Sequence, residues 1–166
     1  VQGASGMIPL EREWIASLCL DARENGVIVI ADEIQCGYYR CGHMSYSIAQ
    51  GIESDILLFG KSMTNGLFPF SALVYEKKLE APFDRDRGCF AHTYQPSALG
   101  CYAAYSVAMY LDLHEMDSRV RMLNEILRAF VDDLVACQYV DQAHILGPSA
   151  SMRYVKGNAA AIADVC

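Results

Sequence analysis

Apolar residues in the first part of the chain recur at helical spacing and then gather into short continuous runs. Residues 10–24 carry apolar side chains at helical spacing, which predicts a helix that ends at Asn25-Gly26. Residues 27–31 (VIVIA) and 55–59 (DILLF) are typical of strands buried on both faces of a parallel sheet. Residues 44–50 predict a short helix between these strands, and residues 70–75 predict a third strand.

Two longer helices are predicted in the second part of the chain. Residues 97–113 are apolar on almost every side, so we expect this helix to be buried or to lie at an interface. Residues 117–139 predict an amphipathic helix. The stripe expected to face the core consists of Val120, Leu123, Ile126, Leu127, Phe130 and Leu134. Further along, the pattern predicts two short strands, at residues 152–155 and 158–164.

The order of these elements predicts an α/β fold. A mainly parallel sheet with flanking helices is followed by the start of an α+β unit. The two long helices meet between Leu111 and Asp117, which places the boundary there. We therefore predict one domain over residues 1–112 and the beginning of a second domain over residues 113–166.

Composition excludes several classes of partner. The chain has 166 residues, of which 53% are hydrophobic and 20% charged, and its net charge is −7. Without a cluster of lysine and arginine, this globular composition is not expected to bind nucleic acid. No apolar run reaches the ~18 residues that a membrane-spanning helix requires, so no membrane partner is expected.

Seven cysteines without a C-x-x-C pair indicate reduced thiols in a cytoplasmic protein. No histidine lies at ligand spacing to these cysteines, so no metal site is expected.

Polar side chains follow the first two predicted strands, where parallel α/β sheets bind their ligands. Asp32 comes directly after residues 27–31, Gln35 lies in the same loop, and Lys61 follows residues 55–59. Thr93 precedes the long apolar helix. Taken singly, each has an ordinary structural explanation, as a turn residue, a solvated side chain or a helix cap. Their occurrence together and in this order favours a site for a bound cofactor.

Three segments carry a resemblance to a known family. IADEIQCGYYRCG, DILLFGKSMTNGLFPFSA and AHTYQPSALGCYAA stand in this order and resemble the class III aminotransferases, which are pyridoxal phosphate (PLP) enzymes of fold type I. The likeness covers residues 1–112 well and continues weakly through MRYVKGNAAAIADV. It implies that residues 1–112 are part of the family's PLP-binding large domain and that residues 113–166 begin its small domain.

The resemblance also implies a role for each candidate residue. Lys61 would be the catalytic residue and would hold PLP as a Schiff base, while Asp32 would bind the protonated pyridine nitrogen. Gln35 would lie beside the phenolic oxygen of the ring. Thr93 would reach the cofactor phosphate of the second subunit in a homodimer. A carboxylate opposite the ring nitrogen suits this chemistry, because the retained proton strengthens the cofactor as an electron sink.

The implied reaction is the transfer of an amino group from an amino acid or amine donor to a keto acid or aldehyde. An aminomutase, racemase or decarboxylase of the same fold is an alternative. A non-catalytic piece is another, because family members are more than twice as long and the segment that cradles the cofactor phosphate is not in these 166 residues. We expect this chain to be a fragment that is inactive alone. A dinucleotide-binding sheet is disfavoured, since no G-x-G-x-x-G follows a predicted strand.

Overall fold

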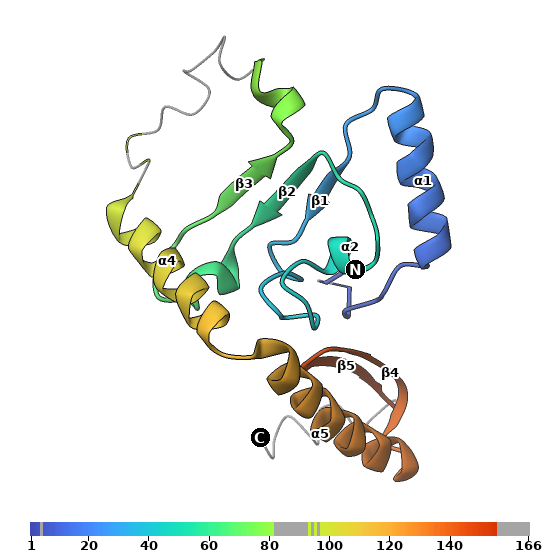
Figure 1. Cartoon of the computed structure of the whole chain (residues 1–166). Helices are drawn as coiled ribbons and strands as arrows, with labels where there is room; N and C mark the ends of the chain where they lie inside the picture. The colour runs from blue at the N-terminus through green and yellow to red at the C-terminus, as the bar shows by residue number, and fades with distance from the viewer. Residues whose placement is uncertain (4, 82–92, 94, 96, 156–166) are drawn as a thin grey trace.

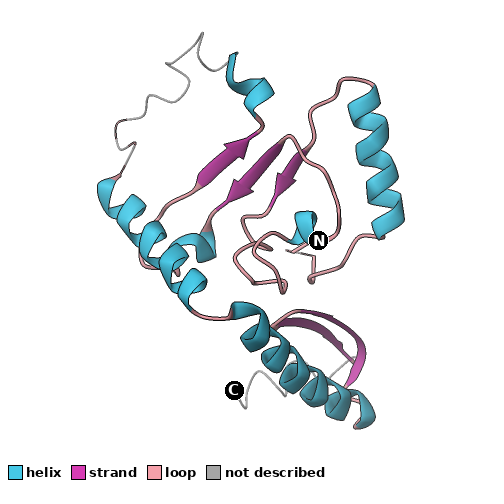
Figure 2. Ribbon diagram, in the orientation of Figure 1, coloured by secondary structure: helices cyan, strands magenta, loops and turns pink. Residues whose placement is uncertain are grey.

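The computed structural model describes residues 1–3, 5–81, 93, 95 and 97–155. Within them lie two sheets (Figure 1): a three-stranded sheet in the order β1 (Ile30–Asp32), β2 (Ile56–Phe59), β3 (Ala72–Tyr75), and a two-stranded sheet of β4 (Val140–Leu146) and β5 (Ser149–Tyr154). Helix α1 (Arg12–Glu24) flanks β1 (Figure 2), and the two long helices follow the first sheet in sequence. This mixed α/β arrangement agrees with the predicted fold class.

The first sheet combines one parallel and one antiparallel pair of strands. Strand β1 (Ile30–Asp32) runs parallel to β2 (Ile56–Phe59), which runs antiparallel to β3 (Ala72–Tyr75). The register places Asp32 opposite Leu58. The carboxyl ends of β1 and β2 therefore lie at the same edge of the sheet, as expected of neighbouring parallel strands.

Short helical elements connect these strands. The helix predicted over residues 44–50 is α2 (Tyr46–Ala49), and single turns η1 (Lys61–Thr64) and η2 (Lys77–Leu79) follow β2 and β3. The predicted helix over residues 10–24 is α1, which begins two residues later than expected and is followed by Gly26 at a φ of 69°. Glycine adopts such a left-handed conformation without steric cost, which explains the end of the helix there.

The apolar run at residues 27–31 is exposed, and the prediction of burial on both faces was wrong. Val27 is 56% exposed, Ile28 52% and Ile30 56%. The strand is also shorter than predicted, because residues 27–29 are not part of β1. Val29 and Ala31 are half-buried, but too little of the described chain packs against this run to cover Val27, Ile28 and Ile30.

Asp55 stabilises the segment that leads into β1. Its Oδ2 accepts a hydrogen bond of 2.7 Å from the Val29 backbone N–H, and its carboxylate forms an ion pair with Lys78. The Asp55 side chain is only 6% exposed. The Lys78 ammonium and, after it, the Val29 N–H stabilise the charged form and lower the pKa of Asp55 from its ordinary value.

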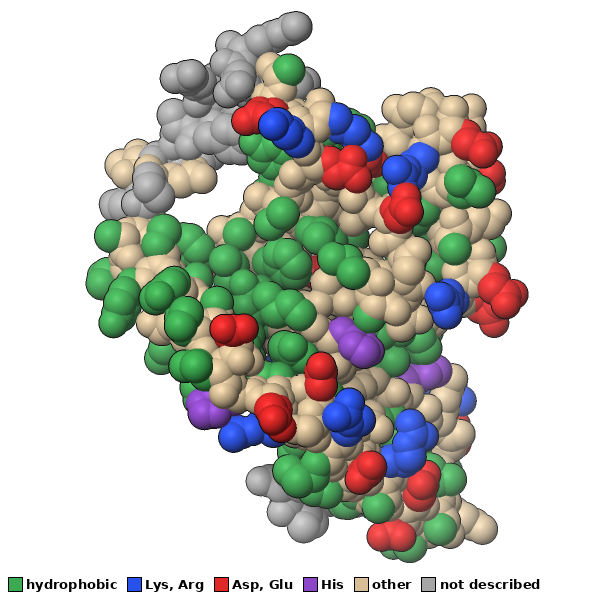
Figure 3. Space-filling model, viewed as in Figure 1, with side chains coloured by type: hydrophobic (Ala, Val, Ile, Leu, Met, Phe, Trp, Pro, Cys, Tyr) green, Lys and Arg blue, Asp and Glu red, His purple; other side chains and the backbone are tan. Residues whose placement is uncertain are grey.

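Helix α4 (Ala98–Leu113) is exposed where the sequence predicted a buried or interfacial helix. The Ser97 hydroxyl caps it by accepting a hydrogen bond from the Gly100 N–H, and η1 packs against it. Leu99 and Tyr102 are nevertheless 69% and 71% exposed, and apolar side chains gather over α4 in Figure 3. Within the described chain most of this helix is therefore not buried. An interface with another chain stays a prediction.

Helix α5 (Met116–Ala136) packs on the hairpin of β4 (Val140–Leu146) and β5 (Ser149–Tyr154). The predicted core stripe was wrong in part, because Leu123, Ile126 and Phe130 are exposed. The side chains that are at least partly covered recur one turn apart along a neighbouring face: Met116, Val120, Asn124, Leu127, Val131 and Leu134. The apolar residues of this helix form more than one stripe, and the hairpin covers only one of them.

The hairpin itself was predicted only in part. Strand β5 overlaps the strand expected over residues 152–155, but β4 was missed, and the strand expected over residues 158–164 lies outside the described residues. The hairpin returns to the first part of the chain, where Leu146 packs against the buried cluster of Met7, Cys36 and Cys41. The division at residues 112 and 113 stays a prediction.

Contacts of the β4–β5 hairpin hold it against the loop that follows β1 and against the N-terminal turn. The Ser149 hydroxyl donates to the Arg40 carbonyl at 2.8 Å, and the Ser151 hydroxyl donates to the Gly6 carbonyl. Gly147 lies against Gly42: a Cβ atom on Gly147 would come within 2.3 Å of the Gly42 nitrogen. A side chain at residue 147 therefore cannot be accommodated without moving the backbone.

Candidate active site

Lys61 begins the turn directly beyond β2. It follows Gly60, is the first residue of η1, and has a φ of 42°. This left-handed conformation is uncommon for a residue with a side chain, and such strain persists where the surrounding structure enforces it. The Thr64 hydroxyl donates to the Phe68 carbonyl at 2.6 Å and fixes the rest of the loop. The Lys61 side chain is exposed at the edge of the sheet.

Asp32 ends β1, and its side chain is exposed. One carboxylate oxygen, Oδ1, accepts a 3.0 Å hydrogen bond from the Ile34 N–H. Within the described residues the other oxygen has no hydrogen-bond partner. The sequence therefore placed Asp32 correctly at the end of the strand, with one oxygen available to a ligand.

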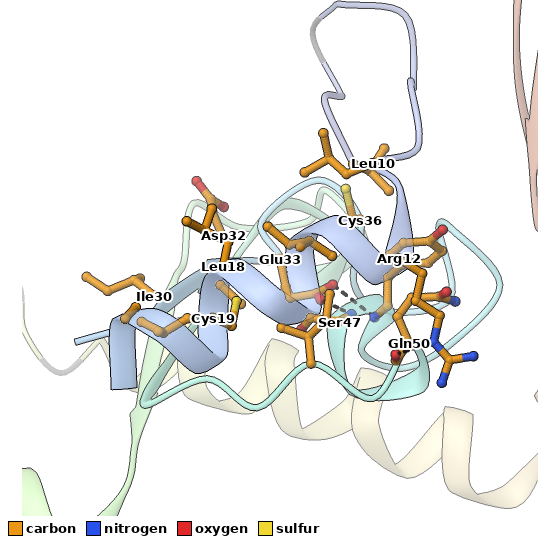
Figure 4. Close-up of a pocket in the computed structure, with 17 residues that line it drawn as sticks. Leu10, Arg12, Leu18, Cys19, Ile30, Asp32, Glu33, Cys36, Ser47 and Gln50 are labelled. Carbon is orange, nitrogen blue, oxygen red and sulfur yellow. Dashed lines mark hydrogen bonds between the residues drawn. The ribbon is translucent and has the colours of Figure 1, made fainter. Parts of the chain in front are cut away.

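The next residue, Glu33, was missed by the sequence analysis. Its carboxylate is buried and accepts hydrogen bonds from the Ser45 hydroxyl and from the Tyr46 and Ser47 N–H groups. Figure 4 shows the Glu33 carboxylate directed at Ser47 and the Asp32 carboxylate directed away from it. Glu33 therefore ties the loop after β1 to α2. The available signal was the helix start at residues 44–50, whose free N–H groups suit a carboxylate.

Gln35 contacts Lys61 directly. The Lys61 Nζ donates a hydrogen bond of 3.4 Å to Oε1 of Gln35. No carboxylate in the described part of the chain forms an ion pair with Lys61. The structure thus brings together the amine and the amide that the sequence selected, from the loops after two different strands.

Asp32 and Lys61 line different pockets. A pocket of about 490 Å³ is lined by Gln35, Arg40, Lys61 and Ser149, among others, so the turn of the β4–β5 hairpin forms part of its wall. Asp32 instead lines a pocket of about 420 Å³ between α1 and β1 (Figure 4). The two residues share an edge of the sheet, but no hydrogen bond or ion pair joins them in the described chain.

Thr93 lies in an exposed turn ahead of α4. It does not cap that helix, because Ser97 does so. The helix-cap explanation for Thr93 was therefore wrong. Its predicted contact with a cofactor of a second subunit is not tested by a single chain.

The cysteine thiols and the metal-ligating side chains are the remaining candidates for chemistry. All five cysteines in the described part of the chain are free; burial raises the pKa of Cys36 and raises that of Cys41 to about 12. Cys89 and Cys166 lie outside the described residues. Among the residues described, no group of three or more His, Cys, Asp or Glu side chains could hold a metal ion. None of the described helices combines the length and apolar character needed to cross a membrane.

Comparison with protein families identifies the chain. The family model for class-III aminotransferases matches residues 1–148. This chain belongs to the class-III aminotransferase family. The match includes the strand ends that carry Asp32 and Lys61, and it continues through α5 and β4.

Two curated relatives have similar sequences. Adenosylmethionine-8-amino-7-oxononanoate aminotransferase of Nitratidesulfovibrio vulgaris is 30% identical over 128 residues, covering 74% of this chain and 23% of the relative. The 2-aminoadipate transaminase of Pseudomonas putida is 36% identical over 104 residues, covering 63% and 24% of the two chains. The chain therefore spans about a quarter of the length of these relatives.

Solved structures share the fold. A taurine:2-oxoglutarate aminotransferase from Bifidobacterium kashiwanohense, in complex with PLP and glutamate, superposes with a TM-score of 0.83 at 24% identity, over 93% of this chain and 35% of that one. An (S)-enantioselective omega-transaminase from Thermomicrobium roseum gives a TM-score of 0.84 at 22% identity, over 96% and 36%. The chain has the fold of part of a fold type I PLP transaminase.

Proposed function

We propose that this chain carries the catalytic lysine of a PLP-dependent aminotransferase. Membership of the class-III family supports the activity. The observation that carries the proposal is the placement of Lys61: a strained residue at the end of β2, with an exposed amine that pairs with Gln35 instead of a carboxylate. An amine outside any ion pair is available to bond to a carbonyl carbon.

The donor set fits PLP. Lys61 offers the amine, Asp32 offers a carboxylate oxygen without a partner in the described chain, and Gln35 offers an amide that both donates and accepts hydrogen bonds. Bound at Lys61, PLP would supply the electron sink that lets an amino group leave one carbon skeleton and join another. Asp32 would hold a proton on the ring nitrogen through a charge-assisted hydrogen bond. Lys61 Nζ would accept the proton that the substrate loses and return it.

The substrates and the assembly follow from the family and are part of the proposal. We expect an amino acid or amine as donor and a keto acid as acceptor, in a cytoplasmic homodimer. Thr93 would serve the cofactor of the second subunit. Residues 1–112 would belong to the large domain, and residues 113–166 would begin the small one.

Replacement of Lys61 in the complete protein tests the proposal. Lys61→Ala should lower the rate of amine transfer to a keto acid by at least about a thousandfold, because the nucleophile is removed. Lys77→Ala is the matched control, since Lys77 is an exposed lysine in η2. Borohydride reduction of the protein with its cofactor should also attach the cofactor to the peptide that contains Lys61. Full activity of Lys61→Ala, or attachment at another lysine, would refute the proposal.

The same assay separates the other reactions of this fold. Product formation that requires a second, keto-acid substrate indicates transamination. Isomerisation of the donor without a second substrate indicates an aminomutase or racemase instead, and release of carbon dioxide indicates a decarboxylase.

A further inference from the structure

The N-terminal turn forms a slot for the Gln35 side chain. A Cβ atom on Gly3 would lie 2.6 Å from both Cδ and Oε1 of Gln35, closer than any side chain can pack. Met7, which is buried, contacts the same amide from a second direction: its sulfur lies 4.0 Å from Nε2 of Gln35. Residues far from Gln35 in the sequence therefore surround its amide.

This slot orients the Gln35 amide. A thioether sulfur accepts weak hydrogen bonds and donates none, so the NH2 end of the amide turns to Met7. The carbonyl end is thereby left for Lys61, whose Nζ donates to it at 3.4 Å. Within the described part of the chain, this is the hydrogen bond that the Lys61 amine makes.

The glycine is not required by the backbone. Gly3 lies outside the left-handed region of φ, in contrast to Gly6, whose φ is 105°. The Gly3 carbonyl accepts hydrogen bonds from the Gly6 and Met7 N–H groups, and a methyl group on the α-carbon would leave both in place. The close contact that a methyl group would make is with Gln35, the flexible end of which can move aside.

We propose that Gly3 is a positioning residue for Lys61. Its missing side chain makes room for the Gln35 amide, and Gln35 in turn holds the Lys61 amine at the end of β2. The inference rests on the proposed function of Lys61, because positioning matters only if that amine reacts. It adds the opening segment of the chain to the machinery of the site.

Substitutions in the complete protein test this relation. Gly3→Ala should displace the Gln35 amide while the thermal midpoint stays within about 2 °C of wild type, since only a flexible side-chain end must move. We expect kcat to fall by about 10- to 100-fold, the usual consequence of a misplaced reacting group, with KM for the donor within about twofold. Ser5→Ala is the matched control, because Ser5 is exposed in the same turn.

A double-mutant cycle isolates the path through Gln35. Gln35→Ala should reproduce the loss of kcat, and Gly3→Ala added to Gln35→Ala should change nothing further. If Gly3→Ala lowers kcat by the same factor whether or not Gln35 is present, the inference is wrong. Should Gly3→Ala not fold, Met7→Leu serves in its place, because it keeps the volume of the side chain but removes the sulfur acceptor.

Chemical labelling without the cofactor supplies an independent readout. In the cofactor-free protein, acylation of Lys61 at a fixed pH is compared with that of Lys77 by peptide mass spectrometry. Gly3→Ala should accelerate Lys61 acylation about two- to fivefold, because the amine is released from the hydrogen bond with Gln35 that holds it. Unchanged labelling together with unchanged kcat overturns the inference. An active Lys61→Ala variant would instead refute the proposed function, while the labelling result would still decide whether Gly3 acts on Lys61.

Discussion

Gly147→Ala should break the contact between the hairpin and the loop after β1. Gly147 has a φ of 56°, and a Cβ atom there would lie 2.3 Å from the nitrogen and 2.5 Å from the Cα of Gly42. The left-handed conformation costs alanine about 1–2 kcal/mol. Relief of the overlap requires the backbone to shift, and overpacking of this kind costs about 1–3 kcal/mol. The expected loss of unfolding free energy is therefore about 2–5 kcal/mol.

Gly66→Ala separates the two contributions. Gly66 also has a left-handed φ, of 75°, but no atom lies within 4 Å of the position that its Cβ would take. This variant should lose only the conformational part, about 1–2 kcal/mol. Urea unfolding of the complete protein, followed by far-UV circular dichroism, measures both variants under one set of conditions. If Gly147→Ala is no more destabilising than Gly66→Ala, the close packing of Gly147 on Gly42 is refuted.

Three further predictions concern the interior. Val131→Ala should cost about 1–2.5 kcal/mol, because Val131 is 2% exposed under the hairpin, whereas Ile126→Ala on the same helix, 61% exposed, should stay within about 0.5 kcal/mol; equal losses in urea unfolding would contradict the assigned face of α5. The pKa of Asp55 is lowered on folding, so its stabilisation is present above the ordinary value of 3.8 and is lost as the pH falls through the folded value. Asp55→Asn should therefore flatten the fall in stability below about pH 4, and an unchanged acid titration would count against the ion pair with Lys78. At pH 8, iodoacetamide should alkylate exposed Cys101 well before Cys41, whose pKa is raised by burial to about 12; equal rates by mass spectrometry would show that Cys41 is accessible.

The elements were predicted well where their signal is local. Helix α1 and the parallel pair β1–β2 follow from apolar spacing and from the turn residues that bound them. The positions of Asp32 and Lys61 at the ends of neighbouring strands follow in turn, because parallel strands place their carboxyl ends at one edge.

Predictions failed where burial depends on a distant partner. Val27, Ile28 and Ile30 lie in an apolar run predicted to be buried, yet all three are exposed, because the described chain packs too little against them. On α5 the apolar pattern permits more than one buried face, and the position of the β4–β5 hairpin selects the face that contains Val131. An apolar pattern indicates which side chains favour burial but not which segment of the protein covers them.

The sequence by itself determined the family and the chemical types of the candidate residues, since side-chain chemistry and the order of motifs are properties of the chain alone. Only the tertiary structure decided how those residues are held. It placed the amide of Gln35 between Met7, 28 residues earlier, and Lys61, 26 residues later. It also set the hairpin turn against the loop after β1. Contacts of this kind depend on the packing of segments that are remote in sequence, and no local pattern records them.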